Sequence, residues 1–330
     1  MARYLGVDGG GSKTAFALID DGGHVLARAT APASYYFNDG VEVVERVLAQ
    51  GVSEICQYAG INTTEIDAGF FGIPAYGEAS ADIERLDAVP GLVLGHDRYS
   101  CDNDMVCGWA GSLACQDGIN VISGTGSMTY GERQGVGHRV GGWGELFGDE
   151  GSAYWVAAQG LNAFSRMSDG RLERGPLYTL LKEHLQLAGD LDVVSLVIDK
   201  WSGNRSSIAA LSTTVCEAAR AEDAVAARIL SEAADELVTL IETTRKLLGF
   251  TDRETVPVSY SGGMFSDEGF LTRFVAALHG QPAKYDLQRP LLDPALGAAL
   301  YAAKHSEQPL SPSALQQLIA AESSQSRSLT

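Results

Sequence analysis

The stretch Gly6-Val-Asp-Gly-Gly-Gly-Ser-Lys-Thr14 carries the most specific pattern in this sequence. Apolar segments precede and follow its glycines, so the pattern predicts two strands joined by a tight glycine turn. A second stretch, Asn120-Val-Ile-Ser-Gly-Thr-Gly-Ser-Met-Thr129, repeats this arrangement more than a hundred residues later. Two such turns predict two half-sites around one nucleotide.

Neither turn matches a standard nucleotide-binding motif. A P-loop would place lysine directly after its last glycine and would open a helix, but here Ser12 precedes Lys13 and a strand pattern follows. The second turn lacks the third glycine of a Rossmann fingerprint. Glycines still let backbone N–H groups approach phosphate oxygens, and the neighbouring hydroxyls add donors. Ordinary tight hairpins explain one copy equally well, but they explain two copies with hydroxyls in place much less well.

The wider pattern predicts an α/β fold. Each glycine turn belongs to an antiparallel meander of three strands. Helical spacing over 41–55, with short apolar runs at Ala68–Phe71 and Leu92–Leu94 taken as buried strands, predicts a mixed sheet with flanking helices. A helix over about 103–115 precedes the second meander, which places a domain boundary near Asp117-Gly118.

The second half of the chain is richer in helical patterns. Amphipathic spacing predicts long helices between 208 and 247, and a strand at Val256–Tyr260 runs into a third glycine turn, Ser261-Gly-Gly-Met-Phe265. Asp293-Pro294 is a strong helix start, with Asp as N-cap and Pro at the first helical position. We therefore expect domains at 1–117 and 118–330, with the helix near 294–304 able to pack back on the N-terminal domain.

Composition narrows the class of protein. The 330 residues, 45% of them hydrophobic, are enough for two cores. A net charge of −18 disfavours nucleic acid or an anionic membrane as a partner. We expect a cytoplasmic protein, because no leader and no membrane-length apolar run is recognisable. The five cysteines lack a CxxC pair, which argues against a disulfide framework and a zinc ribbon.

Taken together and in order, the motifs resemble those of the BadF/BadG/BcrA/BcrD ATPase-type family and, within it, of the N-acetylglucosamine kinase branch of the actin/hexokinase/Hsp70 superfamily. The resemblance covers nearly the whole chain. The motifs that carry it are the two glycine turns, Asn103-Asp104, Gly141-Gly-Trp-Gly144, Gly148-Asp-Glu-Gly-Ser-Ala-Tyr-Trp155 and Ser261-Gly-Gly-Met264.

The resemblance implies two ribonuclease-H-like (actin-like ATPase) domains with mixed sheets and an interdomain nucleotide cleft. ATP and Mg²⁺ are the implied cofactors, adenosine would pack near Gly262 and Gly263, and a homodimer is plausible. The implied phosphate contacts are Gly10, Gly11, Ser12, Lys13 and Thr14 in the first turn and Gly124, Thr125, Gly126 and Ser127 in the second.

Two carboxylates have implied roles in phosphoryl transfer. Asp8, beside the first turn, would hold Mg²⁺ through water, although an Asp before glycines can simply stabilise a turn. Asp104 would position the sugar hydroxyl and accept its proton, with Asp102 as the competing candidate. N-capping of the following helix is the structural alternative for either residue.

The substrate contacts rest on the same resemblance. Asp149 would contact sugar hydroxyls, with Gly142 and Trp143 forming the pocket wall, although Asp149 could cap a helix and Trp143 could be a core aromatic. Further contacts would come from Phe37 and Asn38, in a segment where the family's Asn is displaced or lost. The Cys that precedes the Gly-Gly-Trp motif in some relatives is Val140 here.

The implied function is an ATP-dependent amino-sugar kinase, with N-acetylglucosamine phosphorylated on its 6-hydroxyl. Glucosamine is the alternative acceptor, whose ammonium would seek an acidic partner such as Glu145 or Glu78. An iron–sulfur ATPase activator of a radical dehydratase or reductase is the alternative of another class, which would need thiolates such as Cys101, Cys107 and Cys115 as ligands. A sugar-responsive regulator ranks last, because no DNA-binding segment precedes the fold.

Overall fold

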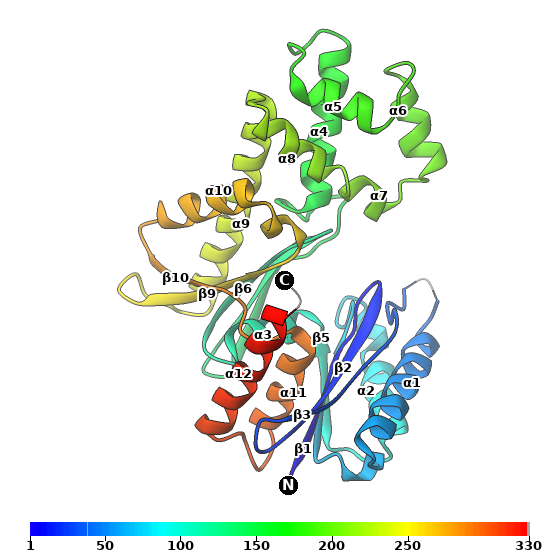
Figure 1. The fold of residues 1–330 in the computed structure, drawn as a ribbon, viewed down its shortest axis with the longest axis vertical. Helices are drawn as coiled ribbons and strands as arrows, with labels where there is room; N and C mark the ends of the chain where they lie inside the picture. Colours follow the sequence, from blue (N-terminus) through cyan, green and yellow to red (C-terminus); the bar gives the residue numbers. More distant parts are fainter. Residues whose placement is uncertain (38, 329–330) are drawn as a thin grey trace. The chain divides into compact units, whose positions relative to one another are not determined.

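The structure, a computed structural model, describes residues 1–37 and 39–328. Contacts divide the chain into two units, each with its own sheet (Figure 1). The first unit combines Met1–Asp117 with Arg289–Thr330, and the second is Gly118–Gln288. Residues 289–330, which the expected boundary at Asp117-Gly118 placed in a C-terminal domain, thus group with the N-terminal residues.

The first unit contains a five-stranded mixed sheet in the order β3-β2-β1-β4-β5. The glycine-rich stretch joins β1 to β2 as an antiparallel pair, in which Asp8 faces Ala15. β3 continues the antiparallel meander, whereas β4 and β5 run parallel to β1. The strands are β1 (Arg3–Asp8), β2 (Lys13–Asp20), β3 (Val25–Pro32), β4 (Ala68–Ile73) and β5 (Tyr99–Asn103).

Helices cover both faces of this sheet (Figure 1). Side chains alternate across a strand, so Val7 packs into the core beneath α1 and α2 while Gly6 faces α11. Phe70, on the α11 side, packs edge to face against Tyr301, with 4.7 Å between the ring centroids. The helices are α1 (Glu42–Ala59), α2 (Ile83–Leu94), α3 (Met105–Leu113), α11 (Pro294–Lys304) and α12 (Pro312–Ser328), with short 3₁₀ turns at Thr63–Glu65 and Ser80–Asp82.

The segment Leu92–Leu94 is the end of α2, so its prediction as a buried strand is wrong. Leu94 is fully buried, but Leu92 is 70% exposed, as expected for a helix that turns one face to solvent. Three apolar residues are too few to separate a strand from the last turn of a helix. The strand that follows is β5, which ends at the Asn103-Asp104 pair.

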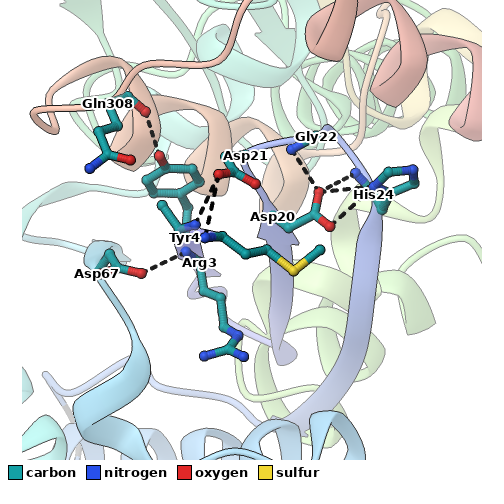
Figure 2. Close-up of polar contacts among 10 residues, drawn as sticks. Arg3, Tyr4, Asp20, Asp21, Gly22, His24, Asp67 and Gln308 are labelled. Carbon is teal, nitrogen blue, oxygen red and sulfur yellow. Dashed lines mark hydrogen bonds and ion pairs between the residues drawn. The ribbon is translucent and has the colours of Figure 1, made fainter.

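Polar contacts fix the start of the chain (Figure 2). The backbone N–H of Arg3 donates to the Asp67 carboxylate at 2.8 Å, and the Tyr4 hydroxyl donates to the Gln308 carbonyl just before α12. In the β2–β3 turn, the buried Asp20 carboxylate accepts backbone N–H bonds from Gly22 and His24, each at 2.9 Å. The first two bonds tie β1 to Asp67 and to the residues before α12, and the Asp20 bonds close the β2–β3 turn.

The second unit repeats the topology of the first. Its sheet has the order β10-β9-β6-β7-β8, with β6, β7 and β8 antiparallel and β9 and β10 parallel to β6. The second glycine turn joins β6 to β7, as the first joins β1 to β2. The strands are β6 (Gly118–Ser123), β7 (Ser127–Arg133), β8 (Val136–Gly141), β9 (Thr255–Ser261) and β10 (Lys284–Gln288).

The helices that follow β8, most of them before β9 and one between β9 and β10, supply most of the second core. Phe164 of α4, Leu237 of α9 and Phe274 of α10 are buried with the apolar side chains of β6 and β9. The helices are α4 (Ala153–Ser168), α5 (Pro176–His184), α6 (Asp192–Val194), α7 (Arg205–Ala209), α8 (Ser212–Arg220), α9 (Ala224–Leu247) and α10 (Glu268–His279), with a π-helical turn at Ser195–Lys200 and a 3₁₀ turn at Gly263–Ser266. Among the described residues, no helix is both long enough and apolar enough to span a membrane.

Candidate active site

The first glycine turn is tied to its neighbours by backbone and by close packing. Gly9 N–H donates to the Gly72 carbonyl of β4 at 2.8 Å, and Ser34 N–H donates to the Gly10 carbonyl at 3.3 Å. A Cβ on Gly9 would lie 2.6 Å from Pro74 Cδ and 2.7 Å from Ser34 Oγ, so only glycine fits there.

The predicted phosphate contacts of this turn divide into exposed and buried groups. Gly11, Ser12 and Lys13 are exposed and open to a ligand. Thr14 is fully buried, and its hydroxyl lies 2.9 Å from the Pro32 carbonyl and 3.0 Å from Ser34 Oγ. The Thr14 hydroxyl therefore supports the turn from inside.

Asp8 ends β1 directly beneath the turn in a strongly acidic setting. Burial raises the pKa of Asp8 well above its usual value, and the nearby carboxylates of Asp104 and Asp293 raise it further. Lys13 opposes these effects. The Asp293 carboxylate is itself held by Arg28 and accepts the Leu296 N–H as the N-cap of α11. The surroundings of Asp8 are therefore acidic, with Lys13 as the opposing positive charge.

Asp104 occupies the N-cap position of α3 without capping it through its side chain. The cap bond comes from Asn103, whose Oδ1 accepts the Met105 N–H at 3.2 Å. The neighbouring Asp102 accepts the Asn103 N–H at 2.6 Å. The Asp104 side chain therefore does not cap α3, which was the structural alternative for this residue. The Asp104 carboxylate lies close enough to Asp8 to raise the pKa of Asp8.

The second glycine turn is held against the start of α4. Ala153 N–H donates to the Gly124 carbonyl at 2.8 Å, and Ser127 Oγ donates to the Glu150 carbonyl at 2.6 Å. Thr125 is exposed at the tip, while Ser127 is buried with its hydroxyl donor already used. Helix α4 is capped by Ser152, which accepts the Trp155 N–H, so Asp149 is not its cap.

Asp149 lies beneath this turn in an ion pair. Its side chain is only 3% exposed, and the Arg205 guanidinium at the start of α7 donates to it. Arg205 Nε also lies 3.4 Å from Glu145 Oε2. Burial raises the pKa of Asp149, whereas Arg205 and backbone hydrogen bonds involving Ser127 and Gly144 lower it.

The remaining predicted site residues are mostly exposed. Trp143 is 73% exposed and is therefore not a core aromatic, while Gly142 N–H donates to the Ser127 carbonyl at 3.0 Å. Phe37 is 46% exposed and stacks edge to face on Tyr36. Asn38 lies outside the described residues.

The third glycine turn lies against the second. Gly262 has a φ of +105°, and a Cβ there would overlap the Ser123 carbonyl group at the end of β6. Gly263, also exposed, begins the 3₁₀ turn. The structure thus brings two of the predicted nucleotide-binding segments together within the second unit.

The cysteines considered as cluster ligands have internal partners. Cys107 Sγ donates to the Val7 carbonyl at 3.5 Å, and Cys115 Sγ lies 4.0 Å from the Ala110 carbonyl. Burial raises the pKa of the Cys101 thiol. Within residues 1–37 and 39–328, no group of three or more His, Cys, Asp or Glu side chains is arranged to hold a metal ion.

The sequence does not indicate the contacts of three residues that complete these local arrangements. Ser34 packs against the first turn, Asp293 lies near Asp8, and Arg205 pairs with Asp149. Each lies far along the chain from the group that it contacts or faces, so no local pattern links the two. Asp293 gave the clearest signal, as a helix start, but that signal indicated its cap bond and not its neighbour Asp8.

Two sheets of one topology, each with a glycine turn between its first two strands, define an α/β protein of the actin-like ATPase class. The chain belongs to the BadF/BadG/BcrA/BcrD ATPase family, whose model matches residues 5–302. Solved structures agree on the fold: a ROK family glucokinase from Streptomyces griseus has a TM-score of 0.54 at 16% identity and covers 92% of this chain and all of its own.

Proteins that are similar to this chain in sequence are named as sugar kinases. An N-acetyl-D-glucosamine kinase from Dictyostelium discoideum is 30% identical over 310 residues, which cover 91% of this chain and 97% of that protein. An N-acetylmuramic acid/N-acetylglucosamine kinase from Clostridium acetobutylicum is 30% identical over 276 residues, 82% of this chain and 88% of its own. A crystal structure from Chromobacterium violaceum, described as a candidate N-acetylglucosamine kinase, has a TM-score of 0.70 at 25% identity and covers 91% of this chain and 98% of its own.

Proposed function

We propose that this protein is an ATP-dependent kinase that transfers the γ-phosphoryl group to the 6-hydroxyl of N-acetylglucosamine. The observation that carries the proposal is the match, over nearly the whole chain, to a relative named for this activity. The Asp104 side chain, which does not cap α3 and lies near Asp8, supplies the carboxylate that the reaction requires.

The glycine turns are the proposed phosphate contacts. Gly10, Gly11, Ser12, Lys13 and the tip residues Gly124, Thr125 and Gly126 would offer donors to the nucleotide, with Thr14 and Ser127 supporting them from inside. Gly262 and Gly263 would contact adenosine. Asp8 would hold Mg²⁺, which neutralises phosphate charge during transfer.

Asp104 would act as the general base. Its carboxylate accepts a hydrogen bond from the sugar 6-hydroxyl and then takes the proton as the oxygen bonds to phosphorus and the bond to the ADP oxygen breaks. Asp104 is half-buried at the start of α3, beside Asp8, so the proposed base lies next to the proposed Mg²⁺ ligand.

The sugar would contact the segment that begins at Gly142, with Trp143 as the exposed aromatic face and Phe37 and Asn38 as further contacts. Asp149 stays a proposed substrate residue, but its carboxylate is buried against Arg205, so a sugar hydroxyl would have to reach it from the surface of that pair. Glu145, considered as a partner for an ammonium group, is already paired with Arg205. This pairing disfavours Glu145, though not Glu78, as the partner of a glucosamine ammonium group.

A coupled ADP-release assay tests the proposal. Purified protein with Mg-ATP is measured against N-acetylglucosamine, glucosamine, glucose, N-acetylmannosamine and N-acetylmuramic acid, and NMR locates the phosphate on the product. We expect the highest kcat/KM for N-acetylglucosamine and phosphorylation at the 6-position. A higher kcat/KM for glucosamine would make glucosamine the proposed substrate. If none of the five sugars is phosphorylated, the proposed kinase function is refuted.

We also propose a cytoplasmic site of action, where ATP is abundant, with no nucleic-acid or membrane partner for a chain of charge −18. A homodimer is the proposed assembly, and light scattering with size-exclusion chromatography measures its mass. The proposed domain boundary is Asp117-Gly118, where the two contact units also divide.

A further inference from the structure

Asp149 connects two segments that the proposed function uses separately. Its backbone adopts a φ of +57°, which turns the carboxylate back beneath the second glycine turn. A Cβ on Gly126 would lie 2.8 Å from Asp149 Oδ2, so turn and carboxylate are in close contact. Backbone hydrogen bonds link the same carboxylate to Ser127, in the turn, and to Gly144, in the Gly142–Phe147 segment.

Arg205 is the side chain that compensates this buried charge. It reaches Asp149 from α7, and its Nη2 atom would lie 2.5 Å from a Cβ on Gly126. The guanidinium also faces Glu145, at 3.4 Å from Nε. A planar guanidinium can hold two carboxylates at once, which a lysine ammonium does less well.

We propose that Arg205 is a positioning residue for phosphoryl transfer: by holding Asp149 it fixes the second phosphate turn and the Gly142–Phe147 segment relative to one another. The inference rests on the proposed function for its catalytic consequence. Arg205 itself contacts neither substrate nor nucleotide in this role, and α7 serves to deliver it.

Removal of the guanidinium has two consequences. The buried carboxylate loses its compensating charge, so the two segments that it joins become less ordered. The pKa of Asp149 also rises, because burial and the neighbouring carboxylate of Glu145 then act without opposition from Arg205, with only the backbone bonds left to lower it. Activity that depends on ionised Asp149 is then lost at a higher pH than in the wild type.

A double-mutant cycle tests this proposal with Arg205→Gln, Asp149→Asn and both together. We expect Arg205→Gln to lower kcat by about 10- to 100-fold, the cost of a small misplacement of reacting groups, and to move the acidic limb of the pH profile upward. The double variant should match Asp149→Asn alone, since Asn needs no compensating charge. The proposal would be overturned if the losses of kcat in the two single variants multiplied in the double variant. It would also be overturned if Arg205→Gln kept the wild-type kcat and pH profile.

Two further variants complete the design. Arg220→Gln removes a more exposed arginine that pairs with Asp267 in the same unit, and it should leave kcat and the pH profile unchanged. Arg205→Lys keeps the charge and should fold even where Arg205→Gln does not. A lysine should give an intermediate loss, of about fivefold or more in kcat by the same misplacement argument, so wild-type kcat in Arg205→Lys would also overturn the proposal.

Hydrogen exchange of the substrate-free protein separates this inference from the proposed function. Exchange at 124–127 and 142–149 should be faster in Arg205→Gln than in the wild type and unchanged in Arg220→Gln. Unchanged exchange in Arg205→Gln would sink the positioning role even if the protein phosphorylated no sugar. If exchange is faster in Arg205→Gln but the wild-type protein phosphorylates no sugar, the local role of Arg205 stands and only the kinase assignment is refuted.

Discussion

Asp8 is placed where it costs stability. Its carboxylate is enclosed at the end of β1 near Asp104 and Asp293, and these surroundings hold its pKa well above the usual value. A carboxyl group whose pKa is raised in the folded state favours folding at low pH, and that contribution is lost as the pH rises through the folded-state pKa. As the pH rises above the usual pKa of a carboxyl group, Asp8 therefore lowers the stability of the first unit.

The Asp8→Asn substitution should accordingly stabilise the protein while abolishing its activity. We expect Tm at pH 8 to rise by about 2–4 °C, the shift that ~1 kcal/mol produces in a unit of this size, and to rise less at pH 5. Calorimetry at the two pH values measures the difference. A lower Tm at pH 8, or activity kept with Mg-ATP, would contradict the assignment of Asp8 as a functional group held under strain.

Asp104→Asn tests the proposed base. Because an amide cannot accept the hydroxyl proton, kcat should fall by about 10²- to 10⁴-fold, while the Kd for Mg-ATP should change little. Asp102→Asn is the matched control, since Asp102 is the neighbouring carboxylate and accepts the Asn103 backbone N–H. A larger loss of kcat in Asp102→Asn than in Asp104→Asn would exchange the roles of the two residues.

Among the elements, helix α11 packs closely against its neighbours, because small residues let the backbones meet. A Cβ on Gly6 would overlap the backbone of α11 near Ala299, and a Cβ on Gly297 would overlap the backbone of α3 at Gly111. Helix α11 therefore lies against β1 and α3 at a distance that no larger side chain permits.

Gly297→Ala should destabilise the protein by at least about 1–3 kcal/mol, the usual cost of overpacking, because the atoms in the way are backbone. Urea unfolding measures the change. Gly11→Ala is the control for stability, since a Cβ at Gly11 would meet no atom within 4 Å. Equal unfolding free energies for Gly297→Ala and Gly11→Ala would show that α3 and α11 can separate at little cost.

Local sequence was sufficient for the elements that local chemistry determines. The two glycine turns, their flanking strands and the start of α11 at Asp293-Pro294 all appear in the structure, because turn and cap preferences act over a few residues. The α/β class and the membership of the family are confirmed. Leu92–Leu94 shows the limit, since burial of a short apolar run does not fix its secondary structure.

The candidate site was less accessible to sequence because its contacts are distant along the chain. Asn103, rather than Asp104, supplies the cap of α3, a distinction between adjacent residues that no spacing rule makes. Arg205 reaches Asp149 across 56 positions, and nothing in either local sequence indicates the other. The functional roles of these residues stay predictions that the substitutions above address.

At the scale of the whole molecule, the net charge of −18 is expected to lower stability. With 42 acidic and 24 basic residues the folded protein repels itself, and salt screens that repulsion over about 10 Å at 0.1 M. We expect Tm to rise by a few degrees, about 2–4 °C, when KCl is raised from about 0.01 M to 0.5 M. A Tm that falls over this range would show that surface ion pairs outweigh the repulsion.

Because residues 289–330 belong to the first unit, that unit can be completed only after the second unit has been synthesised. A ribosome releases residues 118–288, a complete sheet with its helices, before it releases α11, which must still cover β1. During this interval the first sheet exposes an apolar face, and a nascent chain in that state is prone to aggregate or to recruit chaperones. Chains that end just after residue 288 should therefore keep residues 118–288 resistant to proteolysis while residues 1–117 are degraded.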